Sequence, residues 1–244
     1  MPDTRLVLPP LYAILDIDSL LRPGAVVFED SAKPVTPPAD PDAELLALVL
    51  RFAAELHAGG VRLLQYRFKQ LPVRTALAHA LALRQRFCTP ASAKSALAGD
   101  TGSGMQLIMN DRADLCLAAG FDGVHVGHED LAPEAVRQLV GERIIGASTH
   151  NPEQLREADQ GPADYVAIGP VFPTTSKSKT SPLVGLEGVR QARKLTSKPL
   201  VAISGITLEN CRQVREAGAD SVAIIAALLR HPRRAAEEFL QALA

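Results

Sequence analysis

The sequence predicts a single-domain α/β protein spanning residues 1–244 and folded as a closed (β/α)8 barrel, the TIM-barrel architecture. Three observations support this fold class. The length of 244 residues suits one such barrel. Eight short apolar segments alternate with eight longer segments of helical character. The pattern Ala-Gly-X-Asp-X-Val occurs at 119–124 and 217–222, with a looser copy at 161–166, as expected when one βα unit is reused. Strand count alone leaves a doubly wound open sheet as the alternative.

The short segments are four to seven residues long and rich in aliphatic residues, which is typical of buried parallel strands. The expected strands are 11–17, 61–66, 106–109, 123–126, 143–146, 165–169, 199–203 and 221–225. The expected helices are 42–58, 73–87, 112–119, 133–140, 152–158, 186–195, 207–217 and 232–243. Glycines at 59–60, 120 and 218 predict helix ends, and residues 207–210 are typical of a capped helix start.

Two segments interrupt the alternation and are expected to be surface insertions. Residues 18–40 are rich in proline and acidic residues and follow the first strand. They should lie on the face that carries barrel active sites, where they could cover the mouth. Residues 88–104 are small and polar and follow a helix, so we expect them at the opposite face.

Composition narrows the function classes. With 47% hydrophobic and 22% charged residues, the chain is expected to be a water-soluble globular protein. A net charge of −1 and the absence of tryptophan argue against nucleic-acid binding, and no apolar run is long enough to predict a membrane span. Cys88, Cys116 and Cys211 lie far apart, which disfavours structural zinc and disulfides and favours a reducing cytoplasm. We therefore expect small-molecule partners, with a homo-oligomer left open.

Cationic side chains follow the second expected strand at its carboxyl end, where barrel active sites lie. Gln65, Arg67 and Lys69 alternate along the chain and so share one side. An arginine fork and a lysine point charge together suit an anionic group. The alternative is a solvated basic loop.

Carboxylates follow the next two strands. Asn110 and Asp111 follow the third strand, and Asp130 lies after the fourth. Adjacent strand ends bring these side chains together, and two carboxylates with phosphate oxygens and water form a ligand set that suits Mg2+. The alternative is that both aspartates cap the following helices. Zinc at His125, His128 and His150 is disfavoured, because zinc sites need a compact cage of ligands.

The later strand ends add hydroxyls and a second anion site. Ser148 follows the fifth strand, where it serves either a ligand oxygen or a helix cap. A long loop after the sixth strand carries the candidates Thr174, Ser176 and Lys177. Gly205 and the Ile225–Ala226 turn follow the last two strands, a frequent phosphate site in barrels, with a helix N-terminus expected beside Gly205. The pattern predicts a metal-bound diphosphate in one place and a monophosphate in the other.

As an ordered set, these motifs resemble the thiamine phosphate synthase family from Leu11 to about Leu229. The matching stretches are QYRFK at 65–69, ND at 110–111, GVHVGHED at 123–130, IIGASTH at 144–150, DYVAIGPVFPTTSK at 164–177 and ISGI at 203–206. The resemblance implies a (β/α)8 barrel and a Mg2+-dependent transferase. Members of this family join 4-amino-5-hydroxymethyl-2-methylpyrimidine diphosphate to 4-methyl-5-(2-phosphooxyethyl)thiazole, and the resemblance implies the same reaction here. It also implies a dissociative mechanism, in which diphosphate leaves before the thiazole nitrogen attacks.

The resemblance assigns a role to each candidate. Asp111 and Asp130 are implied to hold Mg2+, and Gln65 to face the pyrimidine. The implied diphosphate contacts and catalytic groups are Arg67, Lys69, Asn110, Ser148 and Lys177. Thr174 and Ser176 are implied to line the phosphate and diphosphate region, and Gly205, Ile225 and Ala226 to hold the thiazole phosphate.

The chain departs from the family pattern at several positions. The family commonly has Leu and Glu where Tyr66 and Phe68 stand, and Gln at His128. Ser204 stands at a usual glycine and Ala226 at a common serine, which weakens the phosphate site more than the metal site. Two other functions therefore stay open: a thiazole tautomerase, which needs no metal-bound diphosphate, and a non-catalytic barrel that binds thiazole phosphate.

Overall fold

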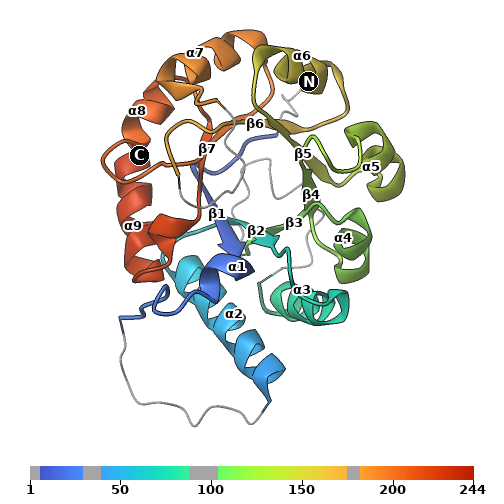
Figure 1. The fold of residues 1–244 in the computed structure, drawn as a ribbon, viewed down its shortest axis with the longest axis vertical. Helices are drawn as coiled ribbons and strands as arrows, with labels where there is room; N and C mark the ends of the chain where they lie inside the picture. The colour runs from blue at the N-terminus through green and yellow to red at the C-terminus, as the bar shows by residue number, and fades with distance from the viewer. Residues whose placement is uncertain (1–5, 30–39, 88–103, 175–181) are drawn as a thin grey trace.

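The computed structural model describes residues 6–29, 40–87, 104–174 and 182–244, and within them eight parallel strands close into a barrel (Figure 1). The strands are β1 (Leu11–Asp16), β2 (Leu63–Arg67), β3 (Gln106–Asn110), β4 (Gly123–Val126), β5 (Ile144–Thr149), β6 (Tyr165–Ile168), β7 (Leu200–Ile203) and β8 (Ser221–Ile224). Each strand pairs with the next in sequence, and β8 pairs with β1, for example Tyr12 opposite Ala223. The closed barrel is confirmed and the open sheet is excluded.

Helices surround the barrel, as Figure 1 shows. They are α2 (Pro41–Ala58), α3 (Val73–Phe87), α4 (Ala113–Ala119), α5 (Pro133–Val140), α6 (Pro152–Gln160), α7 (Gly185–Leu195), α8 (Cys211–Glu216) and α9 (Pro232–Leu243). Two short elements were not expected from the sequence: α1 (Ile17–Leu20), directly after β1, and the 3-10 helix η1 (Ala226–Leu228) after β8. Among the described helices, none is both long and apolar enough to cross a membrane.

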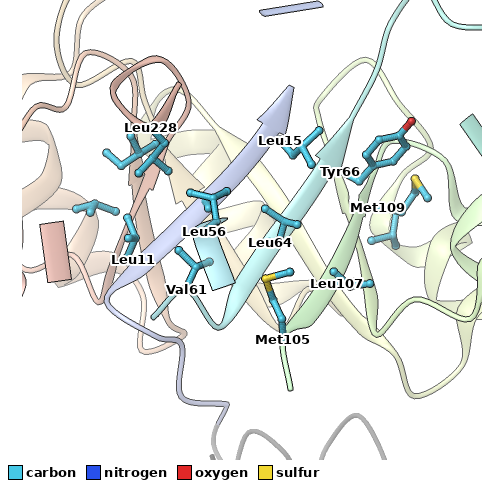
Figure 2. Packing of buried hydrophobic residues seen from close by; sticks show 14 of the residues in the cluster. Leu11, Leu15, Leu56, Val61, Leu64, Tyr66, Met105, Leu107, Met109 and Leu228 are labelled. Carbon is cyan, nitrogen blue, oxygen red and sulfur yellow. The ribbon is translucent and has the colours of Figure 1, made fainter. Parts of the chain in front are cut away.

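Period-two alternation along the strands separates two packed layers. Leu64 and Tyr66 on β2 lie beside Leu107 and Met109 on β3 in the layer between the barrel and the helices (Figure 2). A second buried cluster lies inside the barrel and includes Tyr12, Ile14, Leu63, Ile108, Tyr165 and Ala223. Because β1 and β6 are not neighbours, the contact between Tyr12 and Tyr165 crosses the barrel interior. The same alternation aims the last interior residue of each strand at the mouth.

Several element ends differ from the expected ones. The helix expected at 207–217 begins only at Cys211, because the Asn210 side chain closes a turn before it. Its Oδ1 accepts from the Thr207 N–H at 2.8 Å, and its amide donates to the Gly205 carbonyl at 3.1 Å. β1 ends at Asp16, which caps α1, and β5 runs on to Thr149. Gly59, which ends α2, has a φ of −75°, and the next residue, Gly60, has a φ of +95°.

The described part of the first insertion packs beside the end of β8. Val27 forms a β-bridge with Arg230, and the His231 N–H donates to the Val27 carbonyl at 2.6 Å. Residues 21–29 therefore lie on the expected face, against the chain that follows β8. Residues 30–39 and 88–103, where the rest of both insertions falls, lie outside the described residues.

Candidate active site

Arg67 ends β2 in an ion pair with Asp16, which ends β1. The Asp16 carboxylate is only 4% exposed and also accepts from the Ser19 hydroxyl at 2.6 Å and from the Ser19 N–H at 3.2 Å. Because Ser19 donates two hydrogen bonds to the Asp16 carboxylate, that carboxylate is held in place, and it in turn orients the Arg67 guanidinium. Sequence reasoning missed Asp16, although the alternation of Tyr12, Ile14 and Asp16 along β1 was a signal that could have found it.

Two carboxylates and a lysine meet at the ends of β2, β3 and β4. The Lys69 ammonium donates to Asp111 at 2.6 Å, and the Asp111 carboxyl contacts that of Asp130. Burial and the Asp111 carboxyl together raise the pKa of Asp130 above its usual range. One ammonium does not balance two adjoining carboxylates, so the pair favours a further cation between them.

Local backbone geometry sets up this pair. Asp111 has a φ of +61°, a left-handed conformation that aspartate tolerates better than most residues, and its N–H donates to the His125 carbonyl at 2.8 Å. Asp130 accepts from the Gly127 N–H at 2.8 Å, which closes the turn after β4. Helix capping does not account for either residue, because Arg112 and Ala132 are the N-cap residues of α4 and α5.

Asn110 is the last residue of β3 and faces the same region. It is 7% exposed, and within the described residues its amide nitrogen has no hydrogen-bond partner. A buried donor without a partner is costly unless a ligand accepts from it. The structure thus places Arg67, Lys69, Asn110, Asp111 and Asp130 at or just after the ends of the neighbouring strands β2, β3 and β4.

Ser148 and Gln65 lie at the two ends of a buried hydrogen-bond chain. Ser148 Oγ lies 2.8 Å from His125 Nε2, and His125 Nδ1 lies 3.0 Å from the Tyr165 hydroxyl. The Tyr165 and Tyr12 hydroxyls are 2.8 Å apart, and the Gln65 amide donates to Tyr12 at 2.9 Å. Ser148 does not cap α6, since Asn151 does so by accepting from the Gln154 N–H. Both ring nitrogens of His125 lie within hydrogen-bond distance of side chains inside the barrel, and the two tyrosines were not anticipated from the sequence.

The turns after β6 and β7 pack together at the other side of the mouth. The Phe172 N–H donates to the Ser204 carbonyl at 3.1 Å, and a side chain at Gly205 would lie 2.5 Å from the Pro173 carbonyl. Thr174 follows directly, and the Ile225–Ala226 turn lies at the end of neighbouring β8. The predicted helix N-terminus beside Gly205 is wrong, because α8 begins at Cys211. Ser176 and Lys177 lie outside the described residues.

Ser204 has a φ of +84°, in the region that favours glycine. We expect Ser204→Gly to raise the free energy of unfolding by about 1 kcal/mol, because the left-handed region costs a residue with a Cβ roughly that much. Urea denaturation measures this, and turnover should stay within about twofold because the backbone path is unchanged. A lower unfolding midpoint would show that the Ser204 side chain contributes more than its backbone strain costs.

The remaining features do not compete with this site. Among the described residues, no group of three or more His, Cys, Asp or Glu side chains forms a metal cluster. A cavity of about 280 Å3 lies between α6 and α7, lined by Leu155, Ile168 and Leu195 among others. None of the cationic and acidic side chains at the strand ends lines that cavity. We therefore locate the candidate active site from those side chains rather than from the cavity.

Comparison with known proteins decides the family. Residues 33–228 match the family model described as thiamine monophosphate synthase. The chain belongs to the thiamine monophosphate synthase family. It is 52% identical to the thiamine-phosphate synthase of Koribacter versatilis over 98% of this chain and 97% of that protein. It is 37% identical to that of Chloroflexus aurantiacus over 70% of this chain and 73% of that protein. The resemblance seen in the motifs is thereby confirmed, and the protein is a transferase of this family.

Solved structures agree with the family and the fold. Thiamine phosphate pyrophosphorylase from Pyrococcus furiosus superimposes with a TM-score of 0.71 at 29% identity, covering 96% of this chain and 94% of that one. A structure described as native KDPGal has a TM-score of 0.62 at 15% identity, which supports the barrel fold alone. Thiamine monophosphate synthase family membership therefore rests on sequence and structure together.

Proposed function

We propose that the protein joins 4-amino-5-hydroxymethyl-2-methylpyrimidine diphosphate to 4-methyl-5-(2-phosphooxyethyl)thiazole, forming thiamine phosphate and diphosphate with Mg2+ in the cytoplasm. One observation carries the proposal: the contact of Lys69, Asp111 and Asp130 beside the Asn110 amide and the Arg67 guanidinium. This arrangement suits a metal-bound diphosphate, which a thiazole tautomerase would not require. The free, buried Cys116 and Cys211 fit a reducing compartment.

Asp111 and Asp130 are the residues that would hold Mg2+. Burial and the adjoining Asp111 carboxyl raise the pKa of Asp130, so a cation bound between the two carboxyl groups would favour their ionised forms. Two carboxylates leave coordination positions for water and phosphate oxygens, which is the way that proteins commonly bind this ion. When bound, Mg2+ stabilises the negative charge that builds up on departing diphosphate.

The cationic side chains hold the leaving group. Arg67 is fixed by Asp16 yet keeps further N–H donors for diphosphate oxygens. Lys69 is half-exposed and can follow the charge as it develops, and the buried Asn110 amide gains the acceptor it lacks. Lys177 is proposed to complete this set from the loop after β6. Preorganised donors of this kind stabilise transition-state charge without reorganisation at the moment of reaction.

Bond breaking and bond forming need no enzymic nucleophile. The carbon–oxygen bond to diphosphate breaks with its electron pair on the leaving oxygen, and the thiazole nitrogen then supplies the pair for the new bond. Gln65 is proposed to orient the pyrimidine and Ser148 to contact the diphosphate. Gly205, Ile225 and Ala226 are proposed to hold the thiazole phosphate, with Thr174 and Ser176 lining the space between.

The experiment is a product assay with purified protein, both substrates and Mg2+, reading diphosphate release and separating thiamine phosphate by chromatography. We expect product only when both substrates and metal are present, with loss of product on EDTA addition and recovery with excess Mg2+. Folded protein that makes no product would refute the proposal. Conversion of the thiazole alone, with no need for metal, would identify a tautomerase instead.

A further inference from the structure

We propose that Tyr12, Tyr165 and His125 form a directed hydrogen-bond chain that orients Gln65 and Ser148 toward the substrate. The three are positioning residues, because the chain acts through its two ends. The inference rests on the proposed function for what those ends contact. Beyond that function, we infer that this one hydrogen-bond chain inside the barrel determines which atoms donate and which accept, both on the pyrimidine side at Gln65 and on the diphosphate side at Ser148.

The direction of the chain follows from the groups in it. The Gln65 amide nitrogen can only donate, so Tyr12 accepts from it. Within the described residues, the remaining partner of the Tyr12 hydroxyl is Tyr165, so Tyr12 donates to Tyr165. Tyr165 then donates to His125 Nδ1, which leaves neutral His125 with its proton on Nε2. His125 Nε2 donates to Ser148 Oγ.

The two ends are thereby defined chemically. Ser148 receives a hydrogen bond from His125, so its own hydroxyl proton remains for a diphosphate oxygen. Gln65 spends its amide N–H on Tyr12, so its Oε1 remains to accept from an N–H donor such as the amino group of an aminopyrimidine. Reversing the chain would reverse both ends, which would repel an anionic oxygen at Ser148.

The barrel is built tightly around these side chains. Tyr12 and Tyr165 are 1% and 0% exposed, and the His125 and Tyr165 rings stack with centroids 5.6 Å apart. A Cβ at Gly146 would lie 2.1 Å from Tyr165 Cζ and 2.5 Å from His125 Nδ1, so only glycine leaves room for the pair. Burial holds the pKa of both tyrosines above its ordinary value, so their hydroxyls stay protonated. Packing and protonation together fix the order of donors.

The test starts from Tyr165→Phe, which keeps the ring and removes the central hydroxyl. We expect kcat to fall roughly 10- to 100-fold, as for other residues that orient contacting groups, while the KM for thiazole phosphate stays the same. The matched control is Tyr66→Phe. Tyr66 is equally buried, and its hydroxyl lies 2.9 Å from His79 Nδ1, but it lies on the outward side of β2 (Figure 2). The kcat of the Tyr66→Phe variant should match that of the parent protein.

A double-mutant cycle tests whether Tyr165 acts through Ser148. In a Ser148→Ala background, Tyr165→Phe should lower kcat by a clearly smaller factor than in the parent, because one of the two groups that it positions is gone and only the effect through Gln65 remains. Equal fold losses in both backgrounds would overturn the inference, as would an equal loss in Tyr66→Phe. Thermal unfolding of each variant confirms that folded proteins are compared.

Side-chain nitrogen NMR reads the chain without any turnover. We expect His125 as the neutral tautomer protonated on Nε2 in the parent protein, and loss of that preference in Tyr165→Phe. A proton on Nδ1 in the parent would refute the proposed direction. Because this readout needs no substrate, it stays decisive if the product assay refutes thiamine phosphate synthesis, whereas an active enzyme with unaltered Tyr165→Phe turnover would refute only the chain.

Discussion

Asp130→Asn is expected to lower kcat by about a thousandfold, equivalent to about 4 kcal/mol of transition-state stabilisation. The variant keeps an oxygen that can accept from the Gly127 N–H, so the turn after β4 is preserved. It removes one of the two charges that would bind Mg2+ at Asp111 and Asp130. Raised Mg2+ should restore part of the turnover, because the loss is mainly one of metal affinity. Steady-state kinetics across a Mg2+ titration measures both effects.

Stability separates this role from a structural one. Burial, and after it the Asp111 carboxyl, raise the pKa of Asp130, so ionised Asp130 is unfavourable in the metal-free protein. A carboxyl with a raised folded-state pKa lowers stability as pH rises through its usual range. Asp130→Asn should therefore be at least as stable as the parent at neutral pH without metal.

Asp114→Asn is the matched control for Asp130→Asn. Asp114 is an exposed carboxylate three residues after Asp111, paired with Arg112 rather than with the cluster. Its turnover and Mg2+ dependence should match those of the parent. Equal kinetics in Asp130→Asn and Asp114→Asn would contradict the metal assignment.

Arg67→Ala is expected to lower kcat by roughly 100- to 1,000-fold, the range for removing one preorganised donor to developing charge. Arg67→Lys should recover only part of that loss, because lysine keeps the charge but not the planar fork that Asp16 orients. Single-turnover diphosphate release measures the effect on the chemical step directly.

Arg84→Ala is the control for Arg67→Ala. Arg84 forms an ion pair with Asp122 at 2.9 Å, and Asp122 lies just before β4, at the end of the barrel away from the mouth. Both substitutions remove an arginine from a partly buried ion pair, and both should lower thermal stability. Only Arg67→Ala should lower turnover of the folded protein, and a similar loss in Arg84→Ala would point to a general packing effect.

The cluster at β2 to β4 was predictable because it depends on local rules. Alternation along β2 predicted that the Gln65 and Arg67 side chains point to the same side of the sheet. The order of the strands predicted that Asp111 lies near Asp130. Neither rule needs a contact between distant parts of the chain. The barrel itself was predictable for the same reason, since each βα unit carries its own strand, helix and turn signals.

The parts that sequence reasoning missed depend on barrel closure. Tyr12 and Tyr165 are 153 residues apart and meet only because β1 and β6 face each other across the interior. The Asp16–Arg67 pair likewise needs the register of β1 against β2. At residues 207–210, a side chain competing for backbone groups delayed the helix start, and propensity alone does not predict such competition.

The most direct test of the central claim is calorimetric titration of inorganic diphosphate into the protein with Mg2+ present. It needs neither organic substrate nor turnover. The account predicts saturable 1:1 binding that requires Mg2+ and weakens at least about tenfold, or 1.4 kcal/mol, in both Asp130→Asn and Arg67→Ala, but not in Asp114→Asn. Binding of equal strength in all four proteins, or binding indifferent to Mg2+, would contradict the placement of the metal–diphosphate site at the ends of β2, β3 and β4.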